Sequence, residues 1–227
     1  MKTPRFNVFN QIHKALRALM FDTALVMQQT DFCKADEAAA ILEQTDLLLD
    51  MLDSHAHYED DFILSAAEQH APEIISEFEK EHVIDMELTA ALRAQLGAYR
   101  SAMSAEDRYE LGFRLLHALN EFIAFNLTHM HKEETLLNNI LWANYTDAEI
   151  MQMEANIQQQ IAPEKIFTYF EWMAKSINDA ELISWLIAVK NHAPDVVFSG
   201  LLQVCQDHIT TSRWEPITRL LSEGEMV

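Results

Sequence analysis

Glycine and proline are unusually scarce in this chain, and their scarcity limits the folds that it can adopt. The 227 residues include 4 Gly and 5 Pro, about 4% of the total, whereas ordinary globular proteins contain roughly 12%. Because these two residues mark turns between strands, the sequence favours long helices and an all-α fold. Hydrophobic residues make up 49% of the chain, enough to bury a large core.

The chain is strongly acidic. It contains 36 Asp and Glu against 16 Lys and Arg, which gives a formal net charge of −20. Proteins that bind nucleic acid or anionic membranes use Lys and Arg to neutralise phosphates, so neither is expected as a partner. From Ala35 to Glu79 there are 13 acidic residues and no Lys or Arg. We interpret most of them as solvated helix faces, and the alternative is that some carboxylates hold a cation.

No segment indicates export or membrane insertion. Lys14, Arg17 and Asp22 interrupt the apolar stretches near the start of the sequence, so neither a signal peptide nor a spanning helix fits there. The two cysteines, Cys33 and Cys205, suggest no disulfide framework. A cytoplasmic protein is therefore expected.

Helix-start signals divide the first part of the chain into four long helices. Pro4, Asp36, Pro72 and Ser104 mark their starts, the last in a capping-box arrangement. Long helices joined by short connections are typical of an antiparallel up-down-up-down four-helix bundle. We place this bundle at residues 1–144.

Residues 145–227 are predicted to form a C-terminal helical extension, a bundle of shorter amphipathic helices. Their boundaries are marked by cap residues and by prolines at Thr146, Ala162–Pro163, Asn178 and Ala193–Pro194. No internal repeat is recognised in this segment. We expect the extension to form a homodimer contact or to bind a protein partner.

Histidine and glutamate recur at matched positions on two of the long helices. His55 and Glu59 lie four residues apart on the second helix, and His129 and Glu133 lie four apart on the fourth. This spacing places both side chains of a pair on one helix face. The apolar residues on the same faces are Leu48, Met51 and Phe62 for the first pair and Phe122, Phe125 and Leu136 for the second. Both pairs are therefore predicted to face the core, where a metal ion would remove the cost of a buried carboxylate.

A competing register pairs His57 with Asp61 and His131 with Thr135. Threonine is a poor ligand, and the residues beside His57 are mostly polar, namely Asp53, Ser54 and Asp60. His57 and His131 are therefore predicted to face outward.

His13 and His82 complete a larger constellation. His13 lies on the inward face of the first helix, and His82 shares the inward face of the third helix with Ile75, Phe78 and Met86. Each long helix thus offers one inward histidine, and alternate helices add a glutamate. A lone inward histidine is more often a core residue, but four imidazoles and two carboxylates suit a pair of iron or manganese ions bridged by the glutamates.

The sequence resembles the hemerythrin-like, or HHE cation-binding, domain over roughly residues 5–142. The resemblance is carried by the pattern His13…His55-x-x-x-Glu59…His82…His129-x-x-x-Glu133. That family forms a four-helix bundle with a non-heme diiron centre. The resemblance implies that the four histidines are terminal ligands and that the two glutamates bridge the irons. The C-terminal segment is similar to helical extensions of some bacterial members.

The pattern departs from that of the oxygen-carrying hemerythrins. Those proteins place a second histidine four residues from the first on the third helix and an aspartate five residues after the histidine on the fourth. Here Phe78 and Met86 flank His82, and Glu134 lies five residues after His129. The six-ligand set is more similar to iron–sulfur-cluster repair proteins and to the iron-sensing hemerythrin domain of a ubiquitin-ligase subunit.

Two other candidate motifs are weaker. Glu79-x-x-His82 is a single copy of the ferritin-type motif, which needs two copies. Cys205-x-x-His208 lacks the partner pair that a zinc site requires. His70, His117 and His192 are interpreted as surface or boundary residues.

Three functions stay open at this point. The first is a non-heme diiron protein that binds or senses dioxygen, nitric oxide or iron, with manganese or zinc as alternative metals. The second is a diiron enzyme acting on peroxide or nitric oxide, or in iron–sulfur cluster repair, although no residue is identified as catalytic. The third is a helical interaction protein with zinc or no metal. The sequence favours binding over catalysis.

Overall fold

The computed structural model describes residues 5–223, and all of the regular secondary structure in this part of the chain is helical, as predicted. The described residues divide into two compact units. The first comprises residues 5–10 and 19–158, and the second comprises residues 11–18 and 159–223. The domain boundary predicted at residue 144 stays a prediction. Between residues 5 and 223, no helix has both the length and the apolar character needed to cross a membrane.

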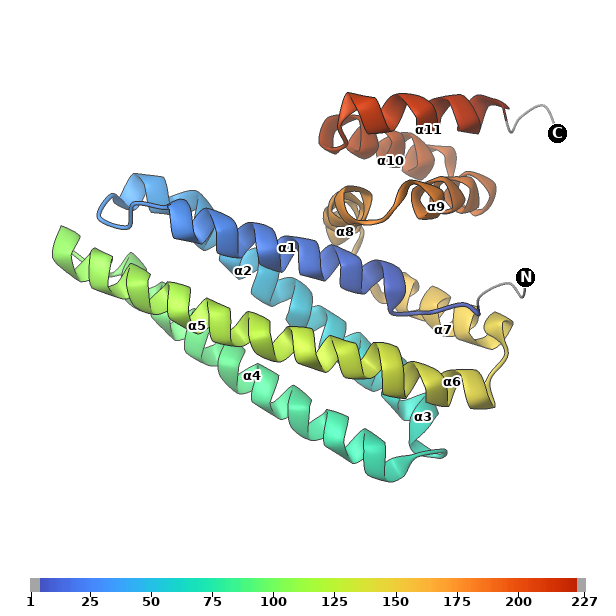
Figure 1. Ribbon diagram of the computed structural model, residues 1–227, viewed down its shortest axis with the longest axis horizontal. Coiled ribbons are helices and arrows are strands. Elements are labelled where there is room, and N and C mark those ends of the chain that lie inside the picture. The colour runs from blue at the N-terminus through green and yellow to red at the C-terminus, as the bar shows by residue number, and fades with distance from the viewer. Residues whose placement is uncertain (1–4, 224–227) are drawn as a thin grey trace. The chain divides into compact units, whose positions relative to one another are not determined.

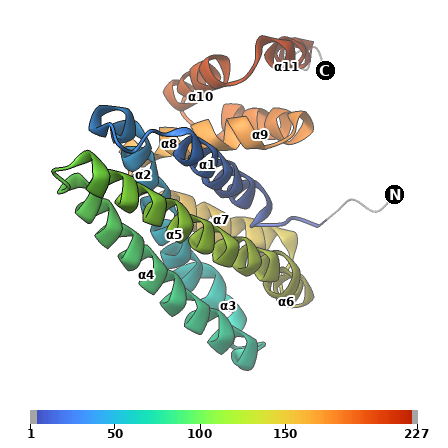
Figure 2. The ribbon, with the colours of Figure 1, turned by 60° about the vertical axis from the view of Figure 1, so that its left-hand side comes forward.

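The four long helices form the expected bundle, and all of their residues except 11–18 belong to the first unit. α1 (Asn10–Gln29), α2 (Ala35–Tyr58), α4 (Pro72–Arg100) and α5 (Ala105–Lys132) run side by side with alternating direction (Figures 1 and 2). Short connections between successive helices enforce this antiparallel order.

Two of these helices continue beyond their α-helical part through a π-helical turn. α2 is followed by the π turn η1 (Glu59–Leu64) and by α3 (Ser65–Glu68). α5 is followed by η2 (Glu133–Leu137) and by α6 (Asn138–Asn144). A π turn accommodates one extra residue and is frequent at functional sites.

The helix starts agree with the sequence signals at two of the four predicted positions. Ser104 caps α5, and its Oγ accepts a hydrogen bond from the backbone N–H of Asp107 at 3.0 Å. Pro72 occupies the first turn of α4. Asp36, however, lies inside the first turn of α2, and Lys34 takes the cap position.

The first helix begins at Asn10 and not near Pro4, which lies outside the described residues. The segment before it is held by side-chain contacts instead. Nη2 of Arg5 donates to the carbonyl of Tyr145 at 2.7 Å, and Nε1 of Trp142 donates to the carbonyl of Phe6 at 2.7 Å. These bonds tie the segment to the end of α6 and so delay the start of the helix.

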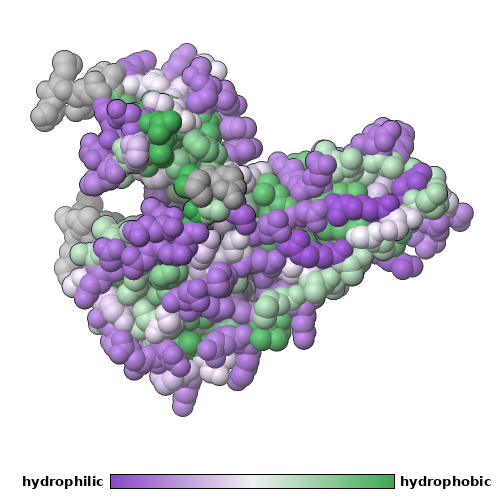
Figure 3. Space-filling model, turned by 180° about the vertical axis from the view of Figure 1, so that it is seen from behind, coloured by the Kyte–Doolittle hydropathy of each residue, from purple (hydrophilic) through white to green (hydrophobic). Residues whose placement is uncertain are grey.

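Acidic residues lie mostly on the surface, as the sequence predicted. Of the 13 between Ala35 and Glu79, ten are exposed, Asp46 and Asp53 are half-buried, and Glu59 is buried. Hydrophilic side chains also predominate on the face of the molecule that Figure 3 shows. Glu59 is therefore the exception that needs an explanation.

The second unit contains four short helices. They are α8 (Pro163–Ser176), α9 (Asp179–His192), α10 (Asp195–His208) and α11 (Thr211–Glu223). α10 packs against α8 and α9, and α11 packs against α9. Their shared core includes Ile177, Leu182, Leu186, Leu201 and Ile217. The predicted starts at 163, 178 and 194 agree with the structure, whereas the start of α11 was not predicted.

These short helices repeat at a constant interval. α7 (Asp147–Gln160) and α8 to α11 begin at residues 147, 163, 179, 195 and 211, which are 16 residues apart. Equivalent positions are apolar throughout, namely Ile150, Ile166, Leu182, Phe198 and Trp214; Met153, Tyr169, Trp185, Leu201 and Ile217; and Ile157, Met173, Val189, Cys205 and Leu221. The expectation that the segment contains no repeat is therefore wrong. The repeat conserves apolar character and not residue identity, which makes it hard to recognise in one sequence.

Candidate metal centre

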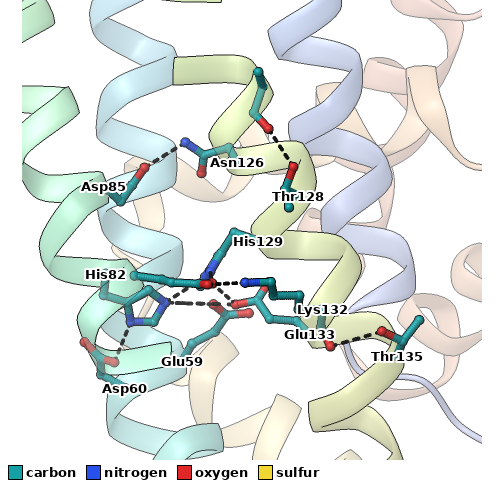
Figure 4. Close-up of polar contacts among 12 residues, drawn as sticks. Glu59, Asp60, His82, Asp85, Asn126, Thr128, His129, Lys132, Glu133 and Thr135 are labelled. Carbon is teal, nitrogen blue, oxygen red and sulfur yellow. Dashed lines mark hydrogen bonds and ion pairs between the residues drawn. The ribbon is translucent and has the colours of Figure 1, made fainter. Parts of the chain in front are cut away.

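Four ionisable side chains of the first unit converge inside the bundle (Figure 4). Glu59, His82, His129 and Glu133 each offer a nitrogen or oxygen atom, and these atoms all lie within 4.8 Å of one another. All four side chains are buried, with exposed fractions of 0% to 6%. The two glutamates begin η1 and η2, and the histidines lie on α4 and α5. Residues that are far apart in the sequence therefore form one compact cluster.

The two His–Glu pairs have the predicted direction. Nε2 of His129 lies 2.8 Å from Oε1 of Glu133, and Nε2 of His55 lies 3.2 Å from Oε1 of Glu59. The side chain of His55 is 11% exposed. Ligand atoms of His55, Glu59 and Glu133 also lie within 4.8 Å of one another. Both glutamates therefore lie within reach of more than one imidazole.

The π turns that begin at these glutamates explain two errors in the predicted inward faces. A π turn rotates the following residues relative to a continuous α-helix by adding one residue. Leu136, seven residues after His129, is 49% exposed, whereas Leu137 is fully buried. In η1 likewise, Ile63 is buried and Phe62 is only half-buried. The predicted inward positions of Leu136 and Phe62 are therefore off by one residue.

His82 reaches the cluster from α4. Its Nε2 lies 3.0 Å from Nε2 of His129, 3.9 Å from Oε2 of Glu59 and 4.0 Å from Oε1 of Glu133. His82 and His129 thus both direct their Nε2 atoms toward the two glutamates.

The inward face of α4 differs from the prediction beyond its histidine. Ile75 and Phe78 are buried as expected, but Met86 is 60% exposed and Asp85 takes the buried position. Oδ1 of Asp85 accepts a hydrogen bond from Nδ2 of Asn126 at 2.7 Å. The partner on α5 supplies the hydrogen bond that a buried carboxyl group requires.

Burial and neighbouring charges shift the pKa values in the cluster. Burial, reinforced by the negative charge of Glu133, raises the pKa of Glu59 well above its ordinary value. Burial by itself would lower the pKa of His82, but contacts with Asp60 and Glu133 raise it to about 9. Burial by itself would also lower the pKa of His129, but the contact with Glu133 raises this pKa above its ordinary value. Positive charge, whether from protons or from a cation, is thus stabilised among these residues.

The donor set fits a transition-metal ion. Imidazole nitrogen and carboxylate oxygen together suit iron, manganese and zinc. Two buried carboxylates close to each other are costly without a compensating positive charge, and a cation held between them would supply it. The chemistry of the cluster therefore agrees with the predicted metal centre.

Two further carboxylates contact the imidazoles on their other ring nitrogen. Oδ1 of Asp60 accepts a hydrogen bond from Nδ1 of His82 at 2.7 Å, and Oε2 of Glu81 accepts one from Nδ1 of His129 at 2.8 Å. Glu81 also forms an ion pair with Lys132. Asp60 is one of the polar residues beside His57 that are predicted to face outward, and Glu81 is not among the predicted site residues. Both adjoin predicted ligands in the sequence, but adjacency does not show which helix a side chain reaches.

His13 is completely buried on α1. It belongs to residues 11–18, which form part of the second unit. One helical turn earlier, Phe9 packs in a hydrophobic cluster of the first unit that also contains Leu137. The role of His13 as a ligand stays a prediction.

The alternative ligand residues lie outside the cluster. The side chains of His57 and Asp61 are 69% and 54% exposed, and His131 is also exposed, as predicted. Glu79 is exposed, so it does not face the cluster together with His82 as the ferritin-type motif requires. Cys205 is buried in the hydrophobic core of the second unit. The three remaining boundary histidines are exposed as well, namely His70, His117 and His192.

Comparison with known proteins adds one match. A family model described as the hemerythrin HHE cation-binding domain matches residues 6–163. The matched region contains all six predicted ligands and extends through α7. No curated protein matches the chain.

Proposed function

The chain belongs to the hemerythrin HHE cation-binding family, and on this premise we propose that its bundle holds two non-heme iron ions and binds or senses a small ligand. The observation that carries the proposal is the buried cluster of imidazoles and glutamates. Its nitrogen and oxygen donors are suited to iron.

Six residues are proposed as metal ligands. His82 and His129 would hold one ion, His13 and His55 the other, and Glu59 and Glu133 both. The proximity of both glutamates to His55 as well as to His82 and His129 supports their bridging role. The complete burial of His13, one turn after Phe9, supports its inclusion.

We propose dioxygen, nitric oxide or iron itself as the species that is sensed. Bound iron would supply redox chemistry and open coordination positions, because six protein ligands leave two ions short of about six positions each. Because the proposed metal centre is buried, only small molecules can reach it. Binding is favoured over catalysis because neither cysteine belongs to the groups of potential metal ligands: Cys33 lies in the connection between α1 and α2, and Cys205 is buried in the hydrophobic core of the second unit.

We further propose that the protein acts in the cytoplasm and that the C-terminal helices contact a second copy or another protein. Exposed hydrophobic side chains of the second unit support such a contact. They include Phe167, Ile187, Val196 and Leu220, which are 45%, 45%, 76% and 52% exposed.

Metal analysis combined with visible spectroscopy tests the proposed function. Purified protein would be analysed for iron, manganese and zinc, and spectra would be recorded under nitrogen, air and nitric oxide. We expect two irons per chain and a reversible spectral change on ligand addition. Turnover of peroxide or nitric oxide would identify an enzyme instead. One zinc or no metal would overturn both and leave a helical interaction protein.

A further inference from the structure

Asp60 and Glu81 contact the two imidazoles of the cluster on the side opposite the shared ligand atoms (Figure 4 shows the first contact). Asp60 lies 2.7 Å from Nδ1 of His82, and Glu81 lies 2.8 Å from Nδ1 of His129. Neither carboxylate belongs to the groups of potential metal ligands. Their position raises the question of what they do for the imidazoles.

A carboxylate in this position determines which ring nitrogen can bind a metal. Ionised carboxylates accept hydrogen bonds and do not donate them, so the Nδ1 atom that faces one carries the proton. The lone pair of Nε2 is then available to an ion, and the hydrogen bond also fixes the ring orientation. In agreement with this, the Nε2 atoms of His82 and His129 converge to 3.0 Å.

Each of the two contacts joins different helices. The bond between Asp60 and His82 connects η1 with α4, and the bond between Glu81 and His129 connects α4 with α5. The adjacent α4 residues Glu81 and His82 therefore have complementary roles. His82 donates a hydrogen bond to η1, and Glu81 accepts one from α5. The contacts align three chain segments relative to one another at the level of the cluster.

The two carboxylates differ in how they are held. Glu81 is 19% exposed and forms an ion pair with Lys132, which directly precedes Glu133. Asp60 is 47% exposed, and among residues 5–223 it has no Lys or Arg partner. An ion pair with Lys132 restricts the rotamers of Glu81 and so supports the bond to His129.

We propose that Asp60 and Glu81 are positioning residues of the metal centre, which hold His82 and His129 with Nε2 directed at the ion. This inference rests on the proposed metal-binding function. It assigns roles to two residues that supply no ligand atom of their own.

Cobalt(II) affinity of the full-length, metal-depleted protein tests the proposal. Asp60→Leu and Glu81→Leu remove the acceptors, and each should weaken cobalt binding by about 10- to 100-fold in competition with a chelator. Glu81→Gln keeps an oxygen that accepts from Nδ1, so it should retain most of the affinity. Asp61→Leu and Glu79→Leu, on exposed neighbours, are matched controls that should bind as the wild type does.

Thermal unfolding of the metal-free variants separates positioning from a general structural role. We expect the Glu81→Leu and Glu81→Gln variants to unfold at similar temperatures while their cobalt affinities differ. Equal cobalt affinity in the wild type and both leucine variants would overturn the inference and leave the proposed function intact. The inference would also fail if Glu81→Gln bound as weakly as Glu81→Leu. A wild-type protein that binds no cobalt would overturn the proposed function and the inference together.

Discussion

Glu59 and Asp61 are two residues apart in the sequence and have opposite surroundings. Glu59 is 3% exposed within the cluster, whereas the side chain of Asp61 is 54% exposed beside His57. We predict that Glu59→Ala loses most bound metal, because the centre loses a shared carboxylate, and that Asp61→Ala retains it. Metal content after purification, measured by atomic emission, checks the difference.

The matched variants Glu133→Ala and His57→Ala extend this comparison to the second pair. Glu133→Ala should lose metal, and His57→Ala should keep it. If Asp61→Ala loses metal and Glu59→Ala retains it, the ligands follow the competing register, which pairs His57 with Asp61. Removal of Glu59 should also make the metal-free protein more stable at neutral pH, because burial raises the pKa of this carboxyl group well above its ordinary value and its desolvation opposes folding.

The raised pKa of His82 makes the stability of the metal-free protein depend on pH. Its pKa of about 9 in the folded state exceeds the ordinary value of 6.5. Protonated His82 therefore makes its full contribution to the free energy of unfolding below about pH 6.5, and this contribution is lost as the pH rises through about 9. One pKa unit corresponds to about 1.4 kcal/mol, so the loss amounts to about 3 kcal/mol. Denaturant unfolding with chelator present measures it, and a flat profile from pH 6.5 to 9 contradicts the prediction.

At the scale of elements, the π turns place the glutamates at the points where the helix repeat changes. In η2 the extra residue allows His129, Glu133 and Leu137 all to face inward. An uninterrupted α-helix would turn Leu136 inward in place of Leu137. The turn therefore reconciles a metal site with a continuous hydrophobic core.

Deletion of Thr135, an exposed residue of η2, should convert the π turn into an α-helical one. Leu137 then follows His129 by seven residues and still faces inward, so the bundle should stay folded. Metal affinity should fall by about tenfold or more, because the widened turn at Glu133 is lost. Circular dichroism and chelator competition measure the two effects.

Deletion of Thr128, in the regular part of α5, serves as the control for the π-turn deletion. It rotates every later residue of the helix and should disrupt both the fold and metal binding. Unchanged metal affinity after the Thr135 deletion would show that the π turn has no role in the site.

Helix packing also gives opposite expectations for two glycines. A Cβ atom at Gly112 of α5 would lie 2.1 Å from Cγ of Phe32, which is buried and cannot move aside easily. A Cβ atom at Gly97 of α4 would meet no heavy atom within 4 Å. Gly112→Ala should therefore destabilise the fold by about 1–3 kcal/mol. Gly97→Ala should stabilise it by about 0.5–1 kcal/mol.

Thermal or denaturant unfolding of the two alanine variants provides the measurement, and each serves as the control for the other. Destabilisation by both substitutions would show that α4 also packs closely at Gly97. Stabilisation by both would show that Phe32 can move away from α5.

At the scale of the whole molecule, α1 takes part in both units. Its residues 11–18 cluster with the C-terminal helices, and Nζ of Lys14 lies 2.5 Å from Oε1 of Glu181. A chain truncated after Gln160 keeps all six proposed ligands but removes these contacts. We predict that its unfolding temperature falls by about 5 °C or more, since about 2–4 °C corresponds to each kcal/mol in a domain of this size. An unchanged unfolding temperature would show that contacts between residues 11–18 and the C-terminal helices do not stabilise the fold.

Much of the fold could be predicted because it depends on interactions within one or two helical turns. The capping bond at Ser104, the first-turn proline at residue 72 and the same-face pair of His129 and Glu133 are all of this kind. The 16-residue repeat is also present in the sequence, as aligned apolar positions, but it conserves no residue identity that would mark it.

The sequence by itself therefore determined the helical class, some of the helix starts, such as those of α4 and α5, and the inward direction of the His–Glu pairs, because local backbone geometry decides them. Only the tertiary structure decided the rest. The bonds of Asp60 to His82 and of Glu81 to His129 cross between helices, and Asp85 replaces Met86 at a buried position that Asn126 of α5 stabilises. Such contacts depend on the rotation and separation of packed helices, which helical periodicity along one segment does not specify.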